Sequence, residues 1–166
     1  MNTFATIEEA RRFDIVTYYT VRMEGEEHSL FLQFLQSCGG NAELEEDMYM
    51  LRSWMEKLGN EIGAKEQYFR FEAARGGDAR ALPPRHLNLD NDLRLYCMRI
   101  NEKIVVLFSG AVKTADTAQD CPQVYPHFSL ANRLCKSIQR AITEREIIIS
   151  EDEDQLIFES DFELEI

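Results

Sequence analysis

The chain has 166 residues, of which 45% are hydrophobic, and it carries a formal net charge of −12. This length suits one domain with a sizeable core, and this apolar fraction excludes a chain that is disordered throughout. No stretch is apolar over the roughly 18 residues that a membrane span needs, and the first residues lack the apolar core of a signal peptide. We therefore expect a cytoplasmic protein without a membrane segment.

The negative charge is concentrated at the C-terminal end. Residues 146–166 contain nine acidic residues and no lysine or arginine, so removing their −9 from the total of −12 leaves −3 for residues 1–145. From Lys65 to Arg145 there are thirteen basic and nine acidic residues, a local excess of +4. The sequence thus predicts one domain over residues 1–145, followed by an acidic tail. The net charge alone does not exclude a nucleic acid as partner.

The N-terminal half begins with a strand and two helices. The β-branched and aromatic residues of 13–22 predict the strand. Apolar residues at helical spacing predict a helix over 30–38, which a glycine pair ends. Asn41 can cap a second helix over 41–62, whose apolar residues recur at steps of four and three. Residues 66–74 then predict a second strand.

The C-terminal half contains a long loop, a hairpin and a helix. Residues 75–92 are rich in glycine, proline, asparagine and aspartate, which predicts the loop. Two apolar runs at 93–100 and 103–109 predict a β-hairpin, and a helix follows from Ser129. Short apolar runs in the tail predict a further hairpin or an edge strand. The order predicts an α+β fold, in which an antiparallel sheet of about four strands packs on one face against an N-terminal helical pair and a C-terminal helix.

Common catalytic motifs are missing from the sequence. It contains no Walker A loop, no GxGxxG fingerprint, no HExxH and no GxSxG. The three histidines lack metal-ligand spacing, and the four cysteines are too widely separated to suggest a zinc site or a disulfide. The acidic residues 151–154 lack the spacing of a calcium loop. We therefore expect neither a metal nor a cofactor.

The remaining candidates are cationic and aromatic. Arg94 shares one face of the strand 93–100 with Tyr96, because alternate residues of a strand point to the same side. Lys113 follows the next strand, and the preceding loop adds three arginines, Arg75, Arg80 and Arg85. A positive groove with aromatic neighbours binds a phosphate backbone and stacks bases. Its cations also stabilise the charged transition state of metal-free RNA cleavage.

The same region resembles a known protein family. The run LRLYCMRINEKIVVLFSGAVKT at 93–114, followed by a helix with the sequence LANRLCKSIQRAI, is similar to the end of RelE/ParE-type toxins, in particular their HigB-like, phage-derived Gp49-like branch. In that family an arginine-bearing strand pairs with an apolar strand that leads into a Lys-Thr stretch and a helix. The upstream order of strand, helical pair and strand also agrees, so the resemblance extends over 13–142.

The resemblance implies a RelE-like α+β fold and a metal-independent mRNA endonuclease, active free or on the ribosome and neutralised by a cognate antitoxin. Carried over by position, Arg94 and Lys113 would be catalytic, and His127 would be a late acid or base. Residues that would bind RNA are Arg75, Arg80, Arg85, Tyr96 and Tyr125. Members of the family are typically shorter and basic, and they carry a lysine pair where this chain has Val112-Lys113.

These departures motivate two further hypotheses. The chain can be a non-enzymatic interaction module, which keeps the fold and binds a protein through its acidic tail. Alternatively the tail is autoinhibitory, because nine tethered acidic residues have a high local concentration at a basic groove and compete there with nucleic acid.

Overall fold

The computed structural model of the chain describes residues 3–71, 78–113 and 121–166. Within these residues seven strands form one mixed sheet: β1 (Phe4–Arg12), β2 (Thr17–Met23), β3 (Arg70–Phe71), β4 (Arg80–Leu82), β5 (Leu93–Arg99), β6 (Ile104–Val112) and β9 (Leu164–Glu165). Three α-helices accompany this described sheet: α1 (Leu30–Gly39), α2 (Glu45–Lys57) and α3 (Tyr125–Thr143). A separate pair of strands consists of β7 (Ile148–Ile149) and β8 (Leu156–Ile157). Short helical turns occupy 42–44, 58–62, 66–68 and 85–87.

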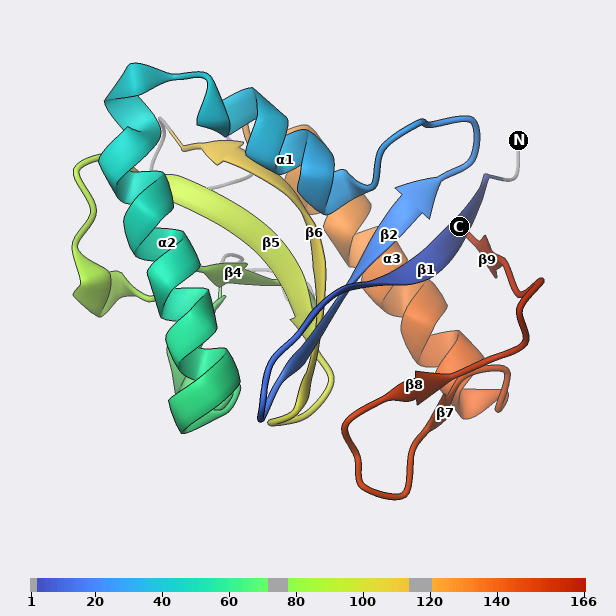
Figure 1. The fold of residues 1–166 in the computed structure, drawn as a ribbon. Helices are drawn as coiled ribbons and strands as arrows, with labels where there is room; N and C mark the ends of the chain where they lie inside the picture. Colours follow the sequence, from blue (N-terminus) through green and yellow to red (C-terminus); the bar gives the residue numbers. More distant parts are fainter. Residues whose placement is uncertain (1–2, 72–77, 114–120) are drawn as a thin grey trace.

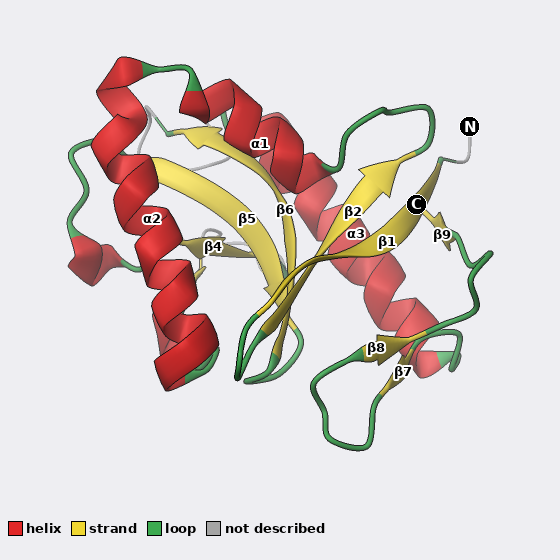
Figure 2. Ribbon diagram, in the orientation of Figure 1, coloured by secondary structure: helices red, strands yellow, loops and turns green. Residues whose placement is uncertain are grey.

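The helices lie on both faces of the sheet (Figure 1), and the same layers are coloured by secondary structure in Figure 2. α1 and α2 cover one face, and α3 covers the other. The strand order is β3-β4-β5-β6-β2-β1-β9. Neighbouring strands are antiparallel, except that β2 and β6 are parallel. An apolar core lies between the sheet and each helical layer.

The α+β class is confirmed, but the expected sheet is wrong in size, direction and order. The described sheet has seven strands instead of about four, it contains a parallel pair, and helices cover both of its faces instead of one. Two strands, β1 and β2, precede the helical pair, which is therefore not N-terminal. The sequence gives no clear signal for β1, because only Ala5 and Ile7 are buried and four of its other seven residues are charged.

The middle of the chain also differs from the prediction. Of the strand expected over 66–74, residues 66–68 form a helical turn and Arg70–Phe71 form the strand β3, whereas 72–74 lie outside the described residues. The loop expected over 75–92 contains β4, which pairs with both β3 and β5. Such short strands carry too few alternating residues for a periodic signal, so only their neighbours in the sheet define them.

The helical pair forms where the apolar spacing predicts it. The hydroxyl of Ser29 caps α1 by accepting a hydrogen bond from the backbone N–H of Leu32 at 3.2 Å. The first turn of α2 carries three acidic residues, which the positive end of the helix favours. Leu51 and Trp54 of α2 are buried in the core that also holds Leu95 of the sheet. Burial of one such side chain contributes about 1.5–3 kcal/mol.

The last helix starts earlier than expected. α3 begins at Tyr125 instead of Ser129, and Pro126 suits its first turn because the N–H groups there have no partner within the helix. Phe128 and Leu134 are buried against the sheet, and the Phe128 ring lies 5.5 Å from the ring of Tyr96. None of the described helices is long and apolar enough to cross a membrane.

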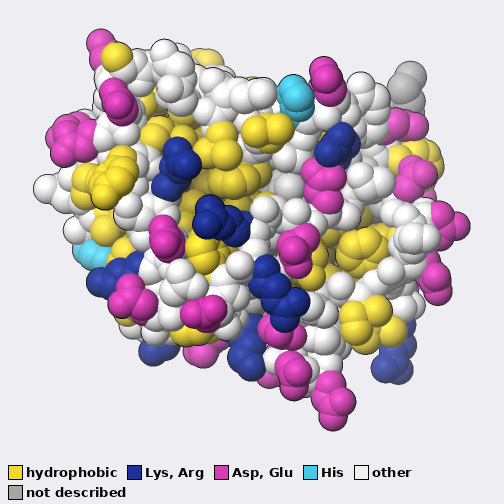
Figure 3. Space-filling view, viewed as in Figure 1, with side chains coloured by type: hydrophobic (Ala, Val, Ile, Leu, Met, Phe, Trp, Pro, Cys, Tyr) yellow, Lys and Arg dark blue, Asp and Glu magenta, His cyan; other side chains and the backbone are white. Residues whose placement is uncertain are grey.

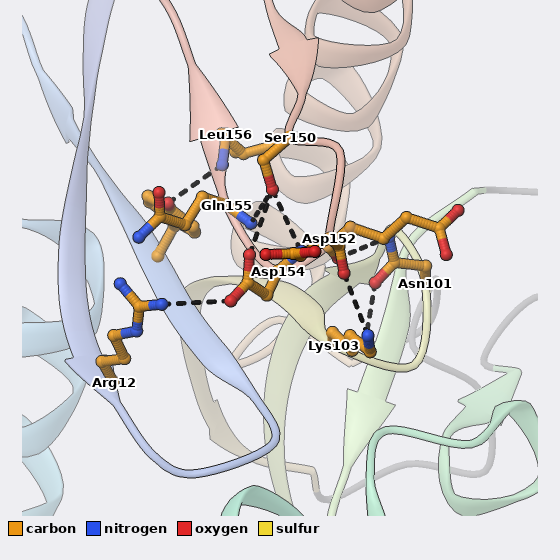
Figure 4. A network of polar contacts seen from close by, with 10 residues as sticks. Arg12, Asn101, Lys103, Ser150, Asp152, Asp154, Gln155 and Leu156 are labelled. Atoms are coloured by element: carbon orange, nitrogen blue, oxygen red, sulfur yellow. Dashed lines mark hydrogen bonds and ion pairs between the residues drawn. The ribbon is translucent and has the colours of Figure 1, made fainter.

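The acidic tail is folded onto the body of the protein (Figure 4). Asp154 forms an ion pair with Arg12 at 3.0 Å, and the backbone carbonyl of Asp152 accepts a hydrogen bond from Lys103 Nζ at 2.9 Å. The backbone N–H of Leu156 donates to the hydroxyl of Tyr19 at 3.0 Å. β7 and β8 form a hairpin, and β9 pairs with β1 at the edge of the sheet.

These contacts place the tail away from the basic groove that the autoinhibition hypothesis requires. Lys103 belongs to the turn between β5 and β6, whereas Arg94 and Lys113 lie at the opposite end of the same hairpin. The tail therefore neutralises Arg12 and contributes to the core, where Ile147, Leu156 and Leu164 are all at most 7% exposed.

Because Leu164 is 2% exposed, Leu164→Ala is expected to lower the free energy of unfolding by about 2–5 kcal/mol, the cost of a cavity in a packed core. Glu163→Ala, at the exposed neighbouring position, is the matched control and should change the free energy of unfolding by less than about 0.5 kcal/mol. Chemical denaturation measures both values. Equal effects of the two substitutions would show that the tail is not part of the core.

Candidate functional site

A hollow of about 260 Å³ lies at the end of the sheet where β5 begins. Arginines from two strands and a helical turn line it, together with a polar loop. The lining residues are Arg70, Pro83, Arg85, Asn88, Leu89, Asp90, Asn91, Asp92, Leu93 and Arg94. We call it the arginine hollow. It brings together two of the residues that the sequence singles out, Arg85 and Arg94, and adds Arg70.

Two guanidinium groups of the arginine hollow converge on one carboxylate. Arg94 Nη1 donates to Asp92 Oδ1 and also to the backbone carbonyl of Leu93 at 3.1 Å. Arg70 Nη1 lies 3.9 Å from the same Asp92 oxygen, and Arg70 Nε donates to the Pro83 carbonyl at 2.7 Å. Shared partners and backbone bonds thus hold both arginines in fixed positions.

The charges of the arginine hollow favour an anion. The Arg94 side chain is 6% exposed and that of Arg70 is 16% exposed, whereas that of Asp92 is 48% exposed. Three arginines and two aspartates line the hollow, so its formal charge is +3 − 2 = +1. Interactions of a guanidinium with an anion are stronger where water is excluded, and its fork of N–H groups matches phosphate oxygens.

A buried carboxylate holds the loop beneath the arginine hollow. Asp47, in the first turn of α2, is 1% exposed. It accepts hydrogen bonds from the backbone N–H groups of Asp90 at 3.0 Å and Asn91 at 2.8 Å, and from the Asn91 side chain at 2.8 Å. The loop that leads into β5 is therefore fixed by α2, and with it the position of Asp92.

A bulge in β6 brings a serine and a histidine close to the strand of Arg94. The register places Leu95 opposite Gly110 and Cys97 opposite Leu107, so two residues of β6 face Tyr96. Ser109 is one of them, and its Oγ lies 2.7 Å from His127 Nδ1 in the first turn of α3. At Gly110 a side chain has no room, because the Arg94 carbonyl occupies the place of its Cβ.

The histidine of this pair is held in its neutral form. Burial lowers the pKa of His127 from its ordinary value of 6.5, because the charged imidazolium loses solvation. Ser109 is 5% exposed, so the hydrogen bond between the two side chains is shielded from water. A neutral imidazole with one nitrogen engaged by a hydroxyl can take up or release a proton at the other.

The other predicted site residues are dispersed. The Lys113 backbone N–H donates to the Asp92 carbonyl at 2.7 Å, which places this lysine beside the arginine hollow. Tyr96 is fully buried under α3 and presents no surface for stacking a base. Arg80 lies elsewhere, 3.3 Å from Glu66 and 3.7 Å above the Phe71 ring. Tyr125 is 47% exposed, and Arg75 lies outside the described residues.

Four residues of this region were missed by the sequence reasoning: Arg70, Asp92, Asp47 and Ser109. Arg70 and Asp92 lie more than twenty positions apart in the sequence, and only the pairing of β3 with β4 and of β4 with β5 joins them. Asp47 resembles any acidic residue at a helix N-terminus. The Gly110 that follows Ser109 is the one local signal, because a glycine inside an apolar strand suggests a bulge.

No family model matches the chain, and neither a curated protein nor a solved structure matches it. The resemblance to RelE/ParE-type toxins therefore stays a prediction that rests on the residues quoted above. Within the described part of the chain, no three histidine, cysteine, aspartate or glutamate residues are grouped to hold a metal ion.

The lowered pKa of His127 predicts a pH dependence of stability. Because the unfolded chain binds the proton more readily, the wild type should lose stability relative to His127→Gln as the pH falls through about 6.5. The contribution is fully present above that value. Chemical denaturation between about pH 8 and about pH 5 measures the difference, with His28→Gln as control for the loss of a histidine. Parallel curves for wild type and His127→Gln would contradict the buried imidazole.

Proposed function

We propose that the chain is a toxin-like, metal-independent mRNA endonuclease of a toxin–antitoxin system, in which the arginine hollow binds the scissile phosphate. The observation that carries this proposal is the convergence of Arg70 and Arg94 on the single carboxylate of Asp92 in a hollow with a positive formal charge. The similarity of residues 93–114 to RelE/ParE-type toxins supports it. A cognate antitoxin is the protein partner in this proposal, and mRNA, free or on the ribosome, is the substrate.

The chemistry uses the chain's own side chains. Arg94 and Arg70 hold non-bridging phosphate oxygens, and Arg85, which is exposed at the rim, contacts the neighbouring phosphate. In the tautomer that this step requires, His127 Nδ1–H donates a hydrogen bond to Ser109 Oγ, and the Nε2 lone pair removes the proton of the RNA 2′-hydroxyl. The 2′-oxygen then attacks phosphorus, and the 5′-oxygen leaves with a proton from Lys113. The products are a 2′,3′-cyclic phosphate and a 5′-hydroxyl.

Substitutions in the arginine hollow test this proposal. Arg85→Ala should lower RNA affinity about tenfold, since a charge-assisted hydrogen bond contributes about 1.5–3 kcal/mol. The slope of log affinity against log salt concentration should fall by about one, because one phosphate contact is lost. Arg94→Lys keeps the charge but removes the planar fork, so cleavage should fall by about tenfold or more. Arg133→Ala, an exposed arginine of α3 on no part of the hollow, is the matched control. Cyclic-phosphate ends are counted on free mRNA and on ribosome-bound mRNA.

Asp92→Asn is expected to act in the opposite direction. Asp92 shares its carboxylate with both arginines and therefore competes with phosphate for them. Its removal should tighten RNA binding while lowering the stability of the apo protein, because a buried guanidinium loses its counter-charge. Filter binding and thermal denaturation measure the two effects. Weaker RNA binding by this variant would contradict a phosphate site.

The alternative is a non-enzymatic interaction module that keeps the fold. A specific observation favours it: an open apolar groove lies on the face of the molecule formed by α1 and α2. The absence of cleavage with both RNA substrates, together with tight binding of a protein partner, would establish this alternative.

A further inference from the structure

An apolar groove crosses the face of the molecule that carries α1 and α2, and the space-filling view shows it as a hollow with basic side chains at its side (Figure 3). Its first part has a volume of about 240 Å³. The β1–β2 hairpin, both helices and β6 line it, through Ala10, Arg11, Phe13, Tyr18, Phe31, Leu35, Arg52, Met55 and Leu107. We call this surface the helical groove.

A second hollow of about 500 Å³ continues the helical groove between the two helices. Leu35 of α1 and Arg52 of α2 line both hollows, so the two are joined side by side. Tyr49, which lines the second hollow, is 72% exposed and extends the apolar surface there. Together these residues make a long apolar surface that the described part of the chain leaves uncovered.

The charges along the helical groove are unequal at its two ends. Arg11 of β1 is exposed in the first hollow and Arg52 is exposed where the two hollows meet, and neither makes an ion pair with any residue of the described chain. The guanidinium of Arg11 lies 4.9 Å from the centre of the Phe13 ring, which holds it beside the apolar floor. Two glutamates, Glu45 and Glu56, line the other hollow. In a chain of net charge −12, these two arginines, which form no ion pair within the described residues, make the first hollow the positive part of the groove.

We infer that the helical groove binds one amphipathic helix of a partner protein. The apolar residues of the partner helix, which recur at steps of three and four, form a ridge that packs on Phe31, Leu35 and Met55. Acidic residues beside the ridge pair with Arg11 and Arg52, and basic residues toward the other end of the helix face Glu45 and Glu56. This inference does not depend on RNA cleavage, since the groove shares no lining residue with the arginine hollow.

The shape of the surface selects a helix over other occupants. Small molecules favour concave sites that enclose most of their surface, whereas the two hollows are joined along an open crevice and flanked by exposed apolar side chains. In a symmetric dimer the same patch would meet itself across a two-fold axis, and the sedimentation measurement below distinguishes this occupant from a partner helix. A convex helix fills the crevice and covers the flanking residues.

Three fluorescein-labelled peptides of about 18 residues, five helical turns, test the inference on the full chain. The first peptide has leucines at helical spacing, with glutamates beside them in its N-terminal half and lysines beside them in its C-terminal half. In the second peptide the glutamates and lysines are exchanged. The third peptide has the residues of the first in scrambled order. Fluorescence anisotropy should show that the first peptide binds at least about tenfold more tightly than the other two. The double variant Arg11→Glu, Arg52→Glu should reverse the preference between the first and second peptides.

Arg133→Glu, which changes an exposed arginine of α3 on the opposite face, is the matched control and should leave all three affinities unchanged. Leu35→Asp should lower the affinity for the first peptide at least about tenfold, because a central apolar contact is lost.

Equal affinities for the first and scrambled peptides, or no binding of any peptide, overturn the inference. Displacement of the first peptide by laurate identifies an acyl ligand instead, and a dimer in sedimentation that Leu35→Asp dissociates identifies a second copy; either result also overturns it. RNA cleavage by the groove variants is measured in parallel, and it should equal that of the wild type.

Discussion

The parallel pairing of β2 with β6 is the constraint on which the remaining structure depends. It joins residues far apart in the chain, Thr17 with Ile104 and Thr20 with Leu107, and a parallel pair needs a long crossover connection. The connection contains the helical pair, which must cross one face of the sheet, and three further strands. Thr20 fixes the arrangement locally: its buried hydroxyl donates to the Leu107 carbonyl at 2.9 Å and accepts from the N–H of Phe31 at the start of α1.

Because β6 lies between β2 and β5 with helices on both sides, all of its residues from Ile104 to Gly110 are buried. Such a strand has no face toward solvent, so a polar side chain on it needs a hydrogen-bond partner within the protein. The bulge opposite Tyr96 directs Ser109 toward α3, where the imidazole of His127 meets its hydroxyl. The close approach of Gly110 to the Arg94 carbonyl follows from the same bulge. The bulge in β6 therefore accounts both for the close packing of Gly110 against β5 and for the position of the Ser109–His127 pair.

The sequence predicts the elements that are long enough to repeat their apolar pattern several times. The hairpin of β5 and β6 and the two helices before it are present, since each has several alternating or helically spaced apolar residues. The strands β1, β4 and β9 escape prediction, because β4 and β9 are short and β1 carries charges on its exposed side. The arginine hollow could be predicted only in part: Arg94 and Arg85 are conspicuous near the motif, whereas Arg70 joins them through the strand pairing β3-β4-β5. A local sequence pattern cannot show that Arg70 belongs to this hollow, because the pairing of β3 with β4 and of β4 with β5 brings it there.

The distribution of positive charge separates two kinds of surface on one acidic chain. In the arginine hollow the guanidinium groups of Arg70 and Arg94 are largely buried, fixed by carbonyl groups and turned toward a carboxylate, an environment that suits a compact anion with several oxygens. In the helical groove the arginines are exposed and lie beside an apolar floor, so an anion there gains little unless apolar surface is buried with it. A phosphate and an acidic amphipathic helix therefore have different places on the molecule. The folded tail occupies neither of them, since its acidic residues contact the opposite end of the β5–β6 hairpin and the edge of the sheet.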